Sequence, residues 1–488
     1  MRVPVVAAIA VSAFSSLARA DDTLTLPQVL AAAVRQSPDL ERASIDLRAA
    51  EAALLRAKGI EDTHLGFGVN AVKQTKAALG LFVNLDETNI GGTVSLTRTL
   101  PTGGTIGVSV GTNHVDELGD IDGDGNPDES KGYLSSGTIF LTQPLWRGGW
   151  PGGFEAPIRD AEHSRDAATL ARQAKARDLI VQIAEAYWQV SLARESLGVR
   201  RASLDLAKQQ LATTEAQIRS DKVARSEALA VKQVIATRQQ DVISAEQQIF
   251  DRSLALRELA GLEIGPDALA VTTEPLGGIG DDNLDVKTTV AAAFEHSALL
   301  ASLAEGVKAA QANLDGAENA AHPRLDLSVS GGPAGGDATL AKSVKSAVNG
   351  DGYQVNASLT FDATLERHAE KGGIADAHAR LQRTRVDERA ARAHIATQAI
   401  RIVQRIKAAY SSAKLSDEAV ELANQNIEAE KKRFELGKST NFDVLRRQDE
   451  LEQAKLRKVS AIVDYLGARA ELDALTGAIL SKYAITLR

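Results

Sequence analysis

Two long stretches of the chain place apolar residues at seven-residue intervals, which is the pattern of coiled-coil helices. Between residues 410 and 436 one apolar track comprises Leu415, Leu422, Ala429 and Leu436, and a second comprises Val420, Ile427 and Phe434. The pattern stops at Gly437 and resumes on Leu456, Val463 and Ala470. Glycine commonly ends a helix, and Ser439, Thr440 or Asn441 can cap the next one. The segment therefore predicts a helical hairpin that turns at Gly437.

The same hairpin occurs 216 residues earlier, where the outgoing track is Leu197, Leu204, Leu211 and Ile218. A second repeat, at an offset of 260 residues, relates Ala31–Leu54 to Ala291–Leu314. The chain is therefore a duplication. We predict a first half over 21–275 and a second over 276–488, each with a short helix, a strand insert and a long hairpin, the hairpins lying at about 154–261 and 364–477.

The inserts, at about 62–143 and 324–361, have a two-residue period instead. In the second insert Tyr353, Val355, Ala357, Leu359 and Phe361 alternate with polar residues. One such hairpin fits a membrane barrel and a soluble sandwich equally well, but no second sheet is available here to cover the apolar face. Two strands from each half cannot close a barrel, so we expect three copies to supply twelve strands.

The first residues have the layout of a secretory signal. Met1-Arg2 precedes an apolar run from Val3 to Phe14 and the small-residue end Ala18-Arg19-Ala20. We expect residues 1–20 to be removed and the mature protein to be exported. The remainder has 54 basic and 64 acidic residues, a net charge of 10 negative, which argues against nucleic acid as a partner.

The sequence contains no cysteine. This excludes disulfides, thiol chemistry and a lipid anchor on an N-terminal cysteine. No stretch after the signal is apolar for 18 residues, so we expect no membrane-spanning helix. The eight histidines, among them His163, show no metal-ligand or triad spacing, and the chain is not expected to be an enzyme or to require a cofactor.

The order of several motifs resembles that of the TolC family of trimeric outer-membrane efflux channels. The motifs are Leu24-Thr-Leu-Pro-Gln-Val-Leu30, Leu141-Thr-Gln-Pro-Leu-Trp-Arg-Gly-Gly149, the pairs Ala186-Tyr187 and Ala409-Tyr410, and the tip from Gly437 to Leu445. The resemblance implies a mainly α-helical fold with β-strands in the membrane. Duplicated helical hairpins would form an α-barrel tunnel, continuous with a trimeric 12-stranded β-barrel in outer-membrane lipid.

The resemblance also implies a function and partners. A homotrimer would extend from the outer membrane into the periplasm and conduct substrates passively. It would receive them from an inner-membrane pump through a periplasmic adaptor, in efflux or type I secretion. The alternative is a secreted periplasmic coiled-coil adaptor or scaffold, which would not need strands inserted between the long helices of both halves.

Two departures from the family pattern concern the strand regions. The second strand-to-helix passage, Phe361-Asp-Ala-Thr-Leu365, lacks the proline and glycines of the first. The spacing Ala57–Leu206 exceeds Ala317–Leu422 by 44 residues, of which 37 enlarge the first strand region. We expect an additional hairpin or a long exterior loop there.

Trp146 and Trp150 lie beside the first passage. Their positions fit either the lipid interface or ordinary packing under the start of a helix.

The enlarged region contains an acidic loop that resembles calcium-binding loops of the EF-hand type. Its candidate ligands are Asp120, Asp122, Asp124, Asn126, Asp128 and Glu129. Oxygen ligands at alternate positions with a glycine at the turn can surround a Ca2+ ion. Lys131 stands where the bidentate glutamate is usual, so Glu129 would have to replace it. A solvated acidic loop is the equal alternative.

The tip of the second hairpin is the candidate gate. By alignment with the family, Phe434 corresponds to an aromatic gate position and Asp443 to the first of two constriction aspartates, whereas Arg446 stands in place of the second. Gly437 forms the turn, and Glu227 adds negative charge from the first-half tip. Threefold symmetry would place rings of Asp443 and Arg446 one helical turn apart, where they could pair and close the entrance. The alternative is that both residues are only capping and solvated residues.

Overall fold

The computed structural model describes residues 23–76, 85–119, 128–221, 223–264, 272–281, 283–483 and 485, so the predicted signal at 1–20 lies outside the described residues. The chain forms two compact units. One takes its described residues from Met1–Ser44, Ala171–Leu300 and Ala391–Arg488, and the other consists of Ile45–Leu170 and Ala301–Ala390. Each unit thus combines segments of both predicted halves.

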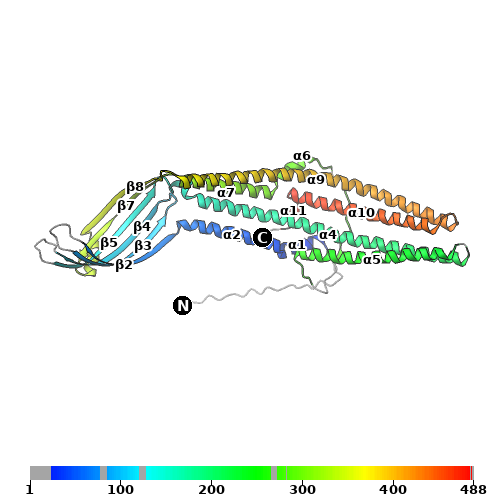
Figure 1. Ribbon diagram of the computed structural model, residues 1–488, viewed down its shortest axis with the longest axis horizontal. Coiled ribbons are helices and arrows are strands. Elements are labelled where there is room, and N and C mark those ends of the chain that lie inside the picture. Colours follow the sequence, from blue (N-terminus) through cyan, green and yellow to red (C-terminus); the bar gives the residue numbers. More distant parts are fainter. Residues whose placement is uncertain are drawn as a thin grey trace. The chain divides into compact units, whose positions relative to one another are not determined.

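The second unit contains a single six-stranded antiparallel sheet, shown in Figure 1. Its strands are β2 (Thr63–Lys76), β3 (Leu85–Thr99), β4 (Thr105–Gly119), β5 (Asp128–Pro144), β7 (Arg324–Asp337) and β8 (Gly352–Asp362), hydrogen-bonded in that order. The first half supplies four strands and the second supplies two. The enlarged region therefore adds a hairpin, and the expectation of two strands from each half is wrong for the first half.

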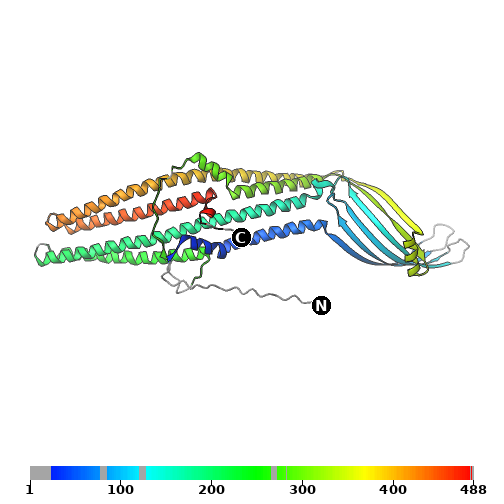
Figure 2. The same ribbon diagram turned by 180° about the vertical axis from the view of Figure 1, so that it is seen from behind.

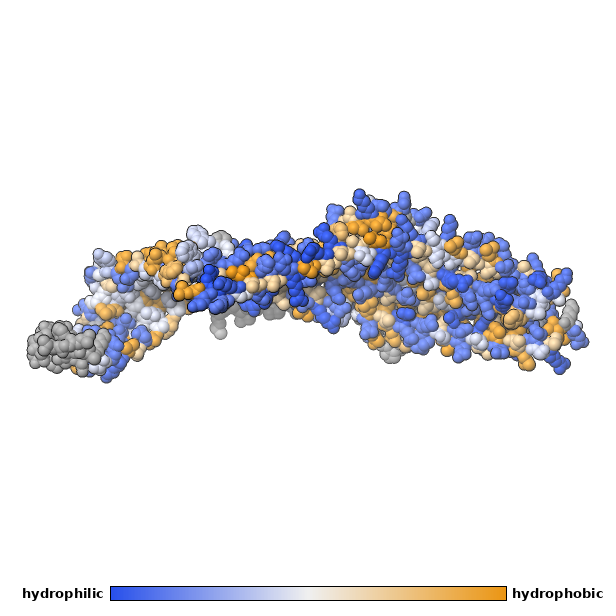
Figure 3. All heavy atoms as spheres, turned by 45° about the horizontal axis from the view of Figure 1, so that its top comes forward, coloured by the Kyte–Doolittle hydropathy of each residue, from blue (hydrophilic) through white to orange (hydrophobic). Residues whose placement is uncertain are grey.

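The register separates an apolar face of the sheet from a polar one. Odd-numbered residues of β8 share a face with Leu327 and Val329 of β7 and with Ile139 and Leu141 of β5. The apolar side chains of this face are exposed in the single chain, with Val355 71% and Leu359 63% accessible. Figure 3 shows hydrophobic residues on the surface over the strands. We define these side chains as the apolar face; the opposite face carries Asn356, Ser358 and Thr360 on β8.

Long helices form the two predicted hairpins. The first consists of α4 (Ala156–Arg219) and α5 (Arg225–Ala260), and the second of α9 (His368–Glu435) and α10 (Asn441–Leu475). The turns of both hairpins lie at the same end of the first unit in both views (Figures 1 and 2). Among the described residues, no helix combines the length and the apolar character needed to cross a membrane.

Each half opens with two short helices. In the first half, the single short helix that we predicted is two helices, α1 (Leu26–Gln36) and α2 (Pro38–Lys58), which are separated at Ser37. Pro38 explains the break, because proline disfavours helical backbone at the residue before it. The second half has a matching break between α6 (Val286–Glu295) and α7 (Ala298–Ala320). The remaining elements are β1 (Thr23–Leu24), η1 (Gly59–Glu61), α3 (Trp150–Phe154), β6 (Thr272–Thr273), α8 (Leu340–Asn349) and α11 (Ile479–Lys482).

The largest apolar core of the first unit is built around α4. Ile180, Ile183 and Tyr187 have no exposed surface and pack with Leu30 of α1 and Leu256 of α5. The hydroxyl of Tyr187 accepts a hydrogen bond of 3.0 Å from the backbone N–H of Glu274. Burying each large apolar side chain contributes about 1.5 to 3 kcal/mol. This core fixes the opening helix against the first hairpin.

The heptads of α9 have two different roles. Ile427 and Phe434, on the second track, are buried within the chain. Leu415, Leu422 and Leu436, on the first track, are 66%, 52% and 72% exposed. The first track is therefore not the seam of the hairpin. An apolar track indicates that a helix face is covered but not which element covers it. The first track of α9 has no partner among the described residues of the chain.

The two strand-to-helix passages use left-handed backbone at different residue types. The first passage has Gly148 at φ 81° and Trp150 at φ 63°. The second, which lacks glycine, places Arg367 at φ 55°, immediately before α9. The Arg367 guanidinium donates a hydrogen bond to the carbonyl oxygen of Ala321. This contact ties the second passage to the chain just before β7.

Candidate functional site

The turn between α9 and α10 is fixed by local hydrogen bonds. Gly437 adopts φ 71°, which L side chains rarely take. The N–H of Gly437 donates to Phe434 O at 2.9 Å, and the N–H of Lys438 donates to Arg433 O at 2.8 Å. These bonds satisfy carbonyl groups at the end of α9. Gly437 thus closes the first helix as the sequence predicted.

Thr440 is the residue that caps α10, in a reciprocal arrangement with Asp443. The N–H of Asp443 donates to Thr440 Oγ1 at 3.2 Å, while the Thr440 hydroxyl donates to Asp443 Oδ2 at 2.7 Å. This hydrogen bond from the Thr440 side chain is the main cause that holds the pKa of Asp443 below its usual value. Asp443 is therefore an ionised carboxylate at the positive end of the helix dipole.

The other predicted gate residues occupy contrasting positions. Phe434 is only 4% exposed, whereas Phe442 is 72% exposed. Arg446 extends into solvent and forms an ion pair of 3.3 Å with Glu450, one turn further along the same helix. Within the described chain, Arg446 and Asp443 are not an ion pair. Sequence reasoning did not single out Phe442.

A buried polar cluster joins the two helical tips. Asn441 is 1% exposed. Its Oδ1 accepts hydrogen bonds from Gln210 Nε2 at 2.8 Å and from Thr214 Oγ1 at 2.7 Å, both on α4. Its Nδ2 donates to Glu227 Oε2 at 3.2 Å, on α5. We call Asn441, Gln210, Thr214 and Glu227 the tip cluster; it brings one predicted residue, Glu227, together with three that were not predicted as site residues.

A second polar contact follows two turns above the tip cluster. Arg238 of α5 is 4% exposed. Its Nη1 donates to Ser203 O at 2.7 Å and to Gln448 Oε1 at 2.9 Å, and its Nη2 donates to Asp449 Oδ1 at 2.6 Å. Charged hydrogen bonds of this kind are stronger than neutral ones. Removing only one partner is destabilising because the other charged group stays buried without a partner. Arg238 thus attaches α10 to both helices of the first hairpin.

Two segments of the chain, residues 104–262 and 290–478, match the family model described as outer membrane efflux protein. Together they cover more than half of the sequence. The chain belongs to this family. No curated protein matches it.

Solved structures of outer-membrane channels share the fold of this efflux protein. VceC from Vibrio cholerae is 17% identical, with a TM-score of 0.66 over 95% of this chain and 97% of that one. CmeC from Campylobacter jejuni is 13% identical, with a TM-score of 0.66 over 93% and 86%. MtrE from Neisseria gonorrhoeae, in its open state, is 15% identical, with a TM-score of 0.61 over 93% and 89%.

Membership of the efflux family decides several expectations. The protein is an outer-membrane channel of the TolC family with a periplasmic extension, and it is not an enzyme. The family implies a trimeric channel that works with efflux pumps. The alternative of a periplasmic adaptor or scaffold is therefore wrong.

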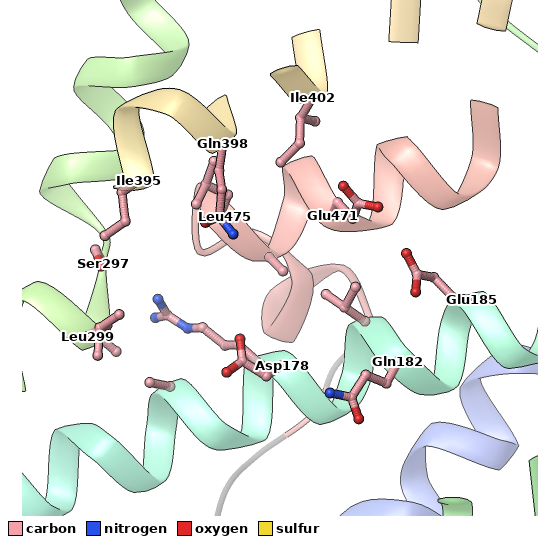
Figure 4. Close-up of a pocket in the computed structure, with 15 residues that line it drawn as sticks. Asp178, Gln182, Glu185, Ser297, Leu299, Ile395, Gln398, Ile402, Glu471 and Leu475 are labelled. Atoms are coloured by element: carbon pink, nitrogen blue, oxygen red, sulfur yellow. The ribbon is translucent and has the colours of Figure 1, made fainter. Parts of the chain in front are cut away.

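The efflux protein also contains a carboxyl pair that sequence reasoning missed. Glu185 of α4 and Glu471 of α10 face one another beside a pocket of about 370 Å³, seen in Figure 4. Burial, together with the hydrogen bond and charge repulsion from Glu471, raises the pKa of Glu185 to about 7. Arg405 partly offsets this effect and is 2.5 Å from Glu471. The two residues are 286 positions apart, so no local pattern signals the pair.

The structure places His163 beside two carboxylates that are distant from it or ordinary in the sequence. Ligand atoms of His163, Asp166 and Glu305 lie within 4.8 Å of one another, which sequence spacing did not indicate. His163 Nδ1 is 2.7 Å from Glu305 Oε2. However, Glu305 is also 2.7 Å from Lys308 Nζ, and Asp166 is 2.8 Å from Arg165 Nε. Because both carboxylates already have cationic partners, we assign no metal to this cluster.

Most of the predicted calcium loop lies outside the described residues, which include only Asp128 and Glu129 of the six candidate ligands. Glu129 forms an ion pair with Lys131, and the same lysine is 3.5 Å from Asp116 on β4. To bind a cation in the loop, Glu129 would have to leave Lys131.

Proposed function

We propose that three copies of this chain form a continuous channel through the outer membrane. The observation that supports this most directly is the exposed apolar face of a sheet whose edge strands, β2 and β8, have unpaired backbone groups in the single chain. Lipid can cover the apolar face, but it cannot satisfy the backbone groups of the strand edges, so the sheet must close into a barrel. The exposed track of Leu415, Leu422 and Leu436 provides a second surface for neighbouring copies.

The strand count changes the expected barrel. Six strands from each of three chains give eighteen strands where twelve were expected. In this arrangement β8 of one copy pairs with β2 of the next. Barrel diameter grows with strand number, so the membrane part would be wider than a twelve-stranded barrel.

The channel acts with an inner-membrane pump and a periplasmic adaptor, in efflux or type I secretion. In this assembly the helical tips form the periplasmic entrance, with Asp443 and Arg446 as charged rings. The tip cluster supports this role, because its buried hydrogen bonds would hold the α9–α10 hairpin against α4 and α5 in a closed entrance.

We further propose that the loop 120–129 is a calcium site.

Membrane fractionation with heated and unheated gels tests the channel. The protein should enter the outer-membrane fraction and migrate as a trimer until heated. A soluble monomer would contradict the proposal.

Crosslinking between introduced cysteines tests the closed barrel, because the native chain contains no cysteine. Ser358→Cys combined in turn with Gly66→Cys, Gly68→Cys and Asn70→Cys should give linked chains in at least one pair; Ser358→Cys with Ser109→Cys, on β4, should not.

A further inference from the structure

The short helix α8 rests directly on the sheet. It connects β7 to β8 at the ends of these strands that are distant from α7 and α9. Ser343 Oγ is 2.7 Å from Ser135 Oγ of β5. A Cβ atom at Gly335 of β7 would lie 2.2 Å from the backbone nitrogen of Ala347. Glycine at this position therefore permits the backbone of α8 to touch the strand.

The register decides which face α8 covers. Ser135 pairs with Gly335, and both share the side of the sheet that carries Ile139 on β5 and Val329 on β7. This side is the apolar face. Because the protein is an outer-membrane channel, the apolar face is the one in contact with lipid. The helix α8 therefore lies on the lipid side of the sheet and not on the polar side.

Aromatic residues indicate the depth at which α8 lies. Tyr353, on the apolar face, is 82% exposed and pairs with Pro333, two residues from Gly335. Eight residues further along β8, Phe361 contacts Trp146 edge to face with ring centroids 6.2 Å apart. Eight residues span about 27 Å along a strand, or about 19 to 22 Å across the membrane at a tilt of about 35–45°, which is most of the ~25 Å apolar band of such barrels. Exposed aromatic residues mark the two edges of that band, so α8 lies at the outer edge.

The free surface of α8 is divided into apolar and basic parts. Leu340, Val344 and Val348 recur every four residues and are 45%, 44% and 79% exposed. Lys342 and Lys345 are exposed on another side of the helix. In the part of the chain that the structure describes, neither lysine has an ion-pair partner. Ser343 and Ala347 are the buried residues and face the strands.

We propose that α8 is an interfacial anchor in the outer leaflet of the membrane. Leu340, Val344 and Val348 extend the apolar face of the sheet into the acyl chains, while Lys342 and Lys345 contact anionic phosphate groups of lipid headgroups. An amphipathic helix with lysines on its polar side binds at the boundary between headgroups and acyl chains. Its apolar side chains are buried among the acyl chains, and its lysines are attracted to the anionic headgroups. The continuity with the lipid-facing sheet identifies lipid, and not another protein, as the partner.

Single thiols test the proposal, since the native protein has no cysteine. Val344→Cys and Val348→Cys are labelled with a fluorescent probe, and the trimer is reconstituted into vesicles of phosphatidylethanolamine and phosphatidylglycerol. Nitroxide-labelled lipids should quench both probes at least threefold more than aqueous iodide does. Stronger quenching by iodide would place α8 in water. Resistance to both quenchers would place it under a neighbouring subunit, and either result overturns the proposal.

Charge reversal tests the headgroup contact. Lys342→Glu with Lys345→Glu should increase iodide quenching of the Val348→Cys probe in vesicles containing phosphatidylglycerol, because the lysines no longer hold the helix at the anionic surface. In vesicles containing only phosphatidylcholine the increase should be much smaller. The control is Lys414→Glu, an exposed lysine of α9. Equal quenching of the variant and the control in both lipids would refute the role of the lysines.

Discussion

Asn441, in the first turn of α10, accepts a hydrogen bond of 2.8 Å from Gln210 of α4, which precedes it by 231 residues. The bond joins the tips of the two duplicated hairpins at a buried position. The first prediction is that Asn441→Ala leaves the buried side-chain amide of Gln210 without an acceptor and lowers the free energy of unfolding by about 1 to 3 kcal/mol. The Thr214 hydroxyl keeps its hydrogen bond to Gln210 O. Thermal unfolding measures this. The matched control, Thr213→Ala, removes only a bond within an exposed turn of α4.

The same variant should alter the channel, because the tip cluster is proposed to hold the entrance closed. Asn441→Ala trimers in planar bilayers should have a higher mean conductance than the wild type. Unchanged conductance in a correctly assembled Asn441→Ala trimer would show that these hydrogen bonds stabilise the hairpins without controlling the entrance.

The second prediction concerns the two faces of β8. Val355→Arg or Leu359→Arg puts a charge on the apolar face and should reduce the amount of assembled trimer, at a cost of about 2 to 4 kcal/mol per site near the bilayer centre. Asn356→Arg, on the polar face, should assemble normally. Unheated gels of outer-membrane fractions compare the three. If all three variants assemble equally, the sheet is not in lipid; if only Asn356→Arg fails to assemble, the assignment of the faces is reversed.

The third prediction concerns charge at the entrance. Arg446→Asp should increase cation selectivity and block by multivalent cations, because it removes positive charge beside Asp443. Asp443→Ala should decrease both, and it should also weaken the capping of α10. Planar-bilayer recordings of reversal potential and of block by multivalent cations measure these effects. If neither substitution changes them, the constriction lies elsewhere in the channel.

The fourth prediction follows from the carboxyl pair. In the folded protein the pKa of Glu185 is raised to about 7 from its ordinary value of 4.5, so folding favours its protonated form. The stabilisation from this proton is fully present below pH 4.5 and is lost as the pH rises through 7. Glu185→Gln, which stays neutral, should flatten the pH dependence of the unfolding temperature between pH 5 and 8. The control, Glu246→Gln, removes an exposed partner of Arg201 and should keep the wild-type slope.

The fifth prediction addresses the acidic loop. Calorimetric titration of the purified trimer with Ca2+ should reveal one site per chain, abolished by Asp122→Ala with Asp124→Ala. Asp205→Ala with Asp251→Ala, which removes two exposed carboxylates of the first hairpin, should leave it intact. A native protein that releases no heat with Ca2+ would make the segment an ordinary solvated loop.

Periodicity predicted the elements of this fold because each is long enough for its apolar residues to repeat. The heptads located both hairpins, and the alternation on β8 identified its apolar face. The same heptads could not say which neighbour covers Leu415, since a single sequence does not distinguish contacts within a chain from contacts between copies. The hairpin of β2 and β3 was harder to identify, because Gly91 and Gly92 interrupt the alternation in β3.

The tip cluster and the carboxyl pair could not be predicted for a different reason. Ser439, Thr440 and Asn441 are all good helix caps, and only the approach of α4 assigns the cap to Thr440 and buries Asn441. Glu185 and Glu471 look like ordinary charges on helix surfaces. Their contact and the raised pKa of Glu185 result from packing between helices that are distant in the sequence, which the spacing of residues along either helix does not indicate.

The sheet gained its extra strands as a complete hairpin, and this has a geometric consequence for the channel. A chain that enters the membrane from the helices and returns to them must cross an even number of times. With an even number, the first and last strands run in opposite directions, so adjacent copies meet as antiparallel neighbours whatever the number of strands. Each further hairpin would add six strands to a trimer while leaving both helical hairpins unchanged. The bore of such a channel in the membrane can thus be adjusted independently of its helical periplasmic part.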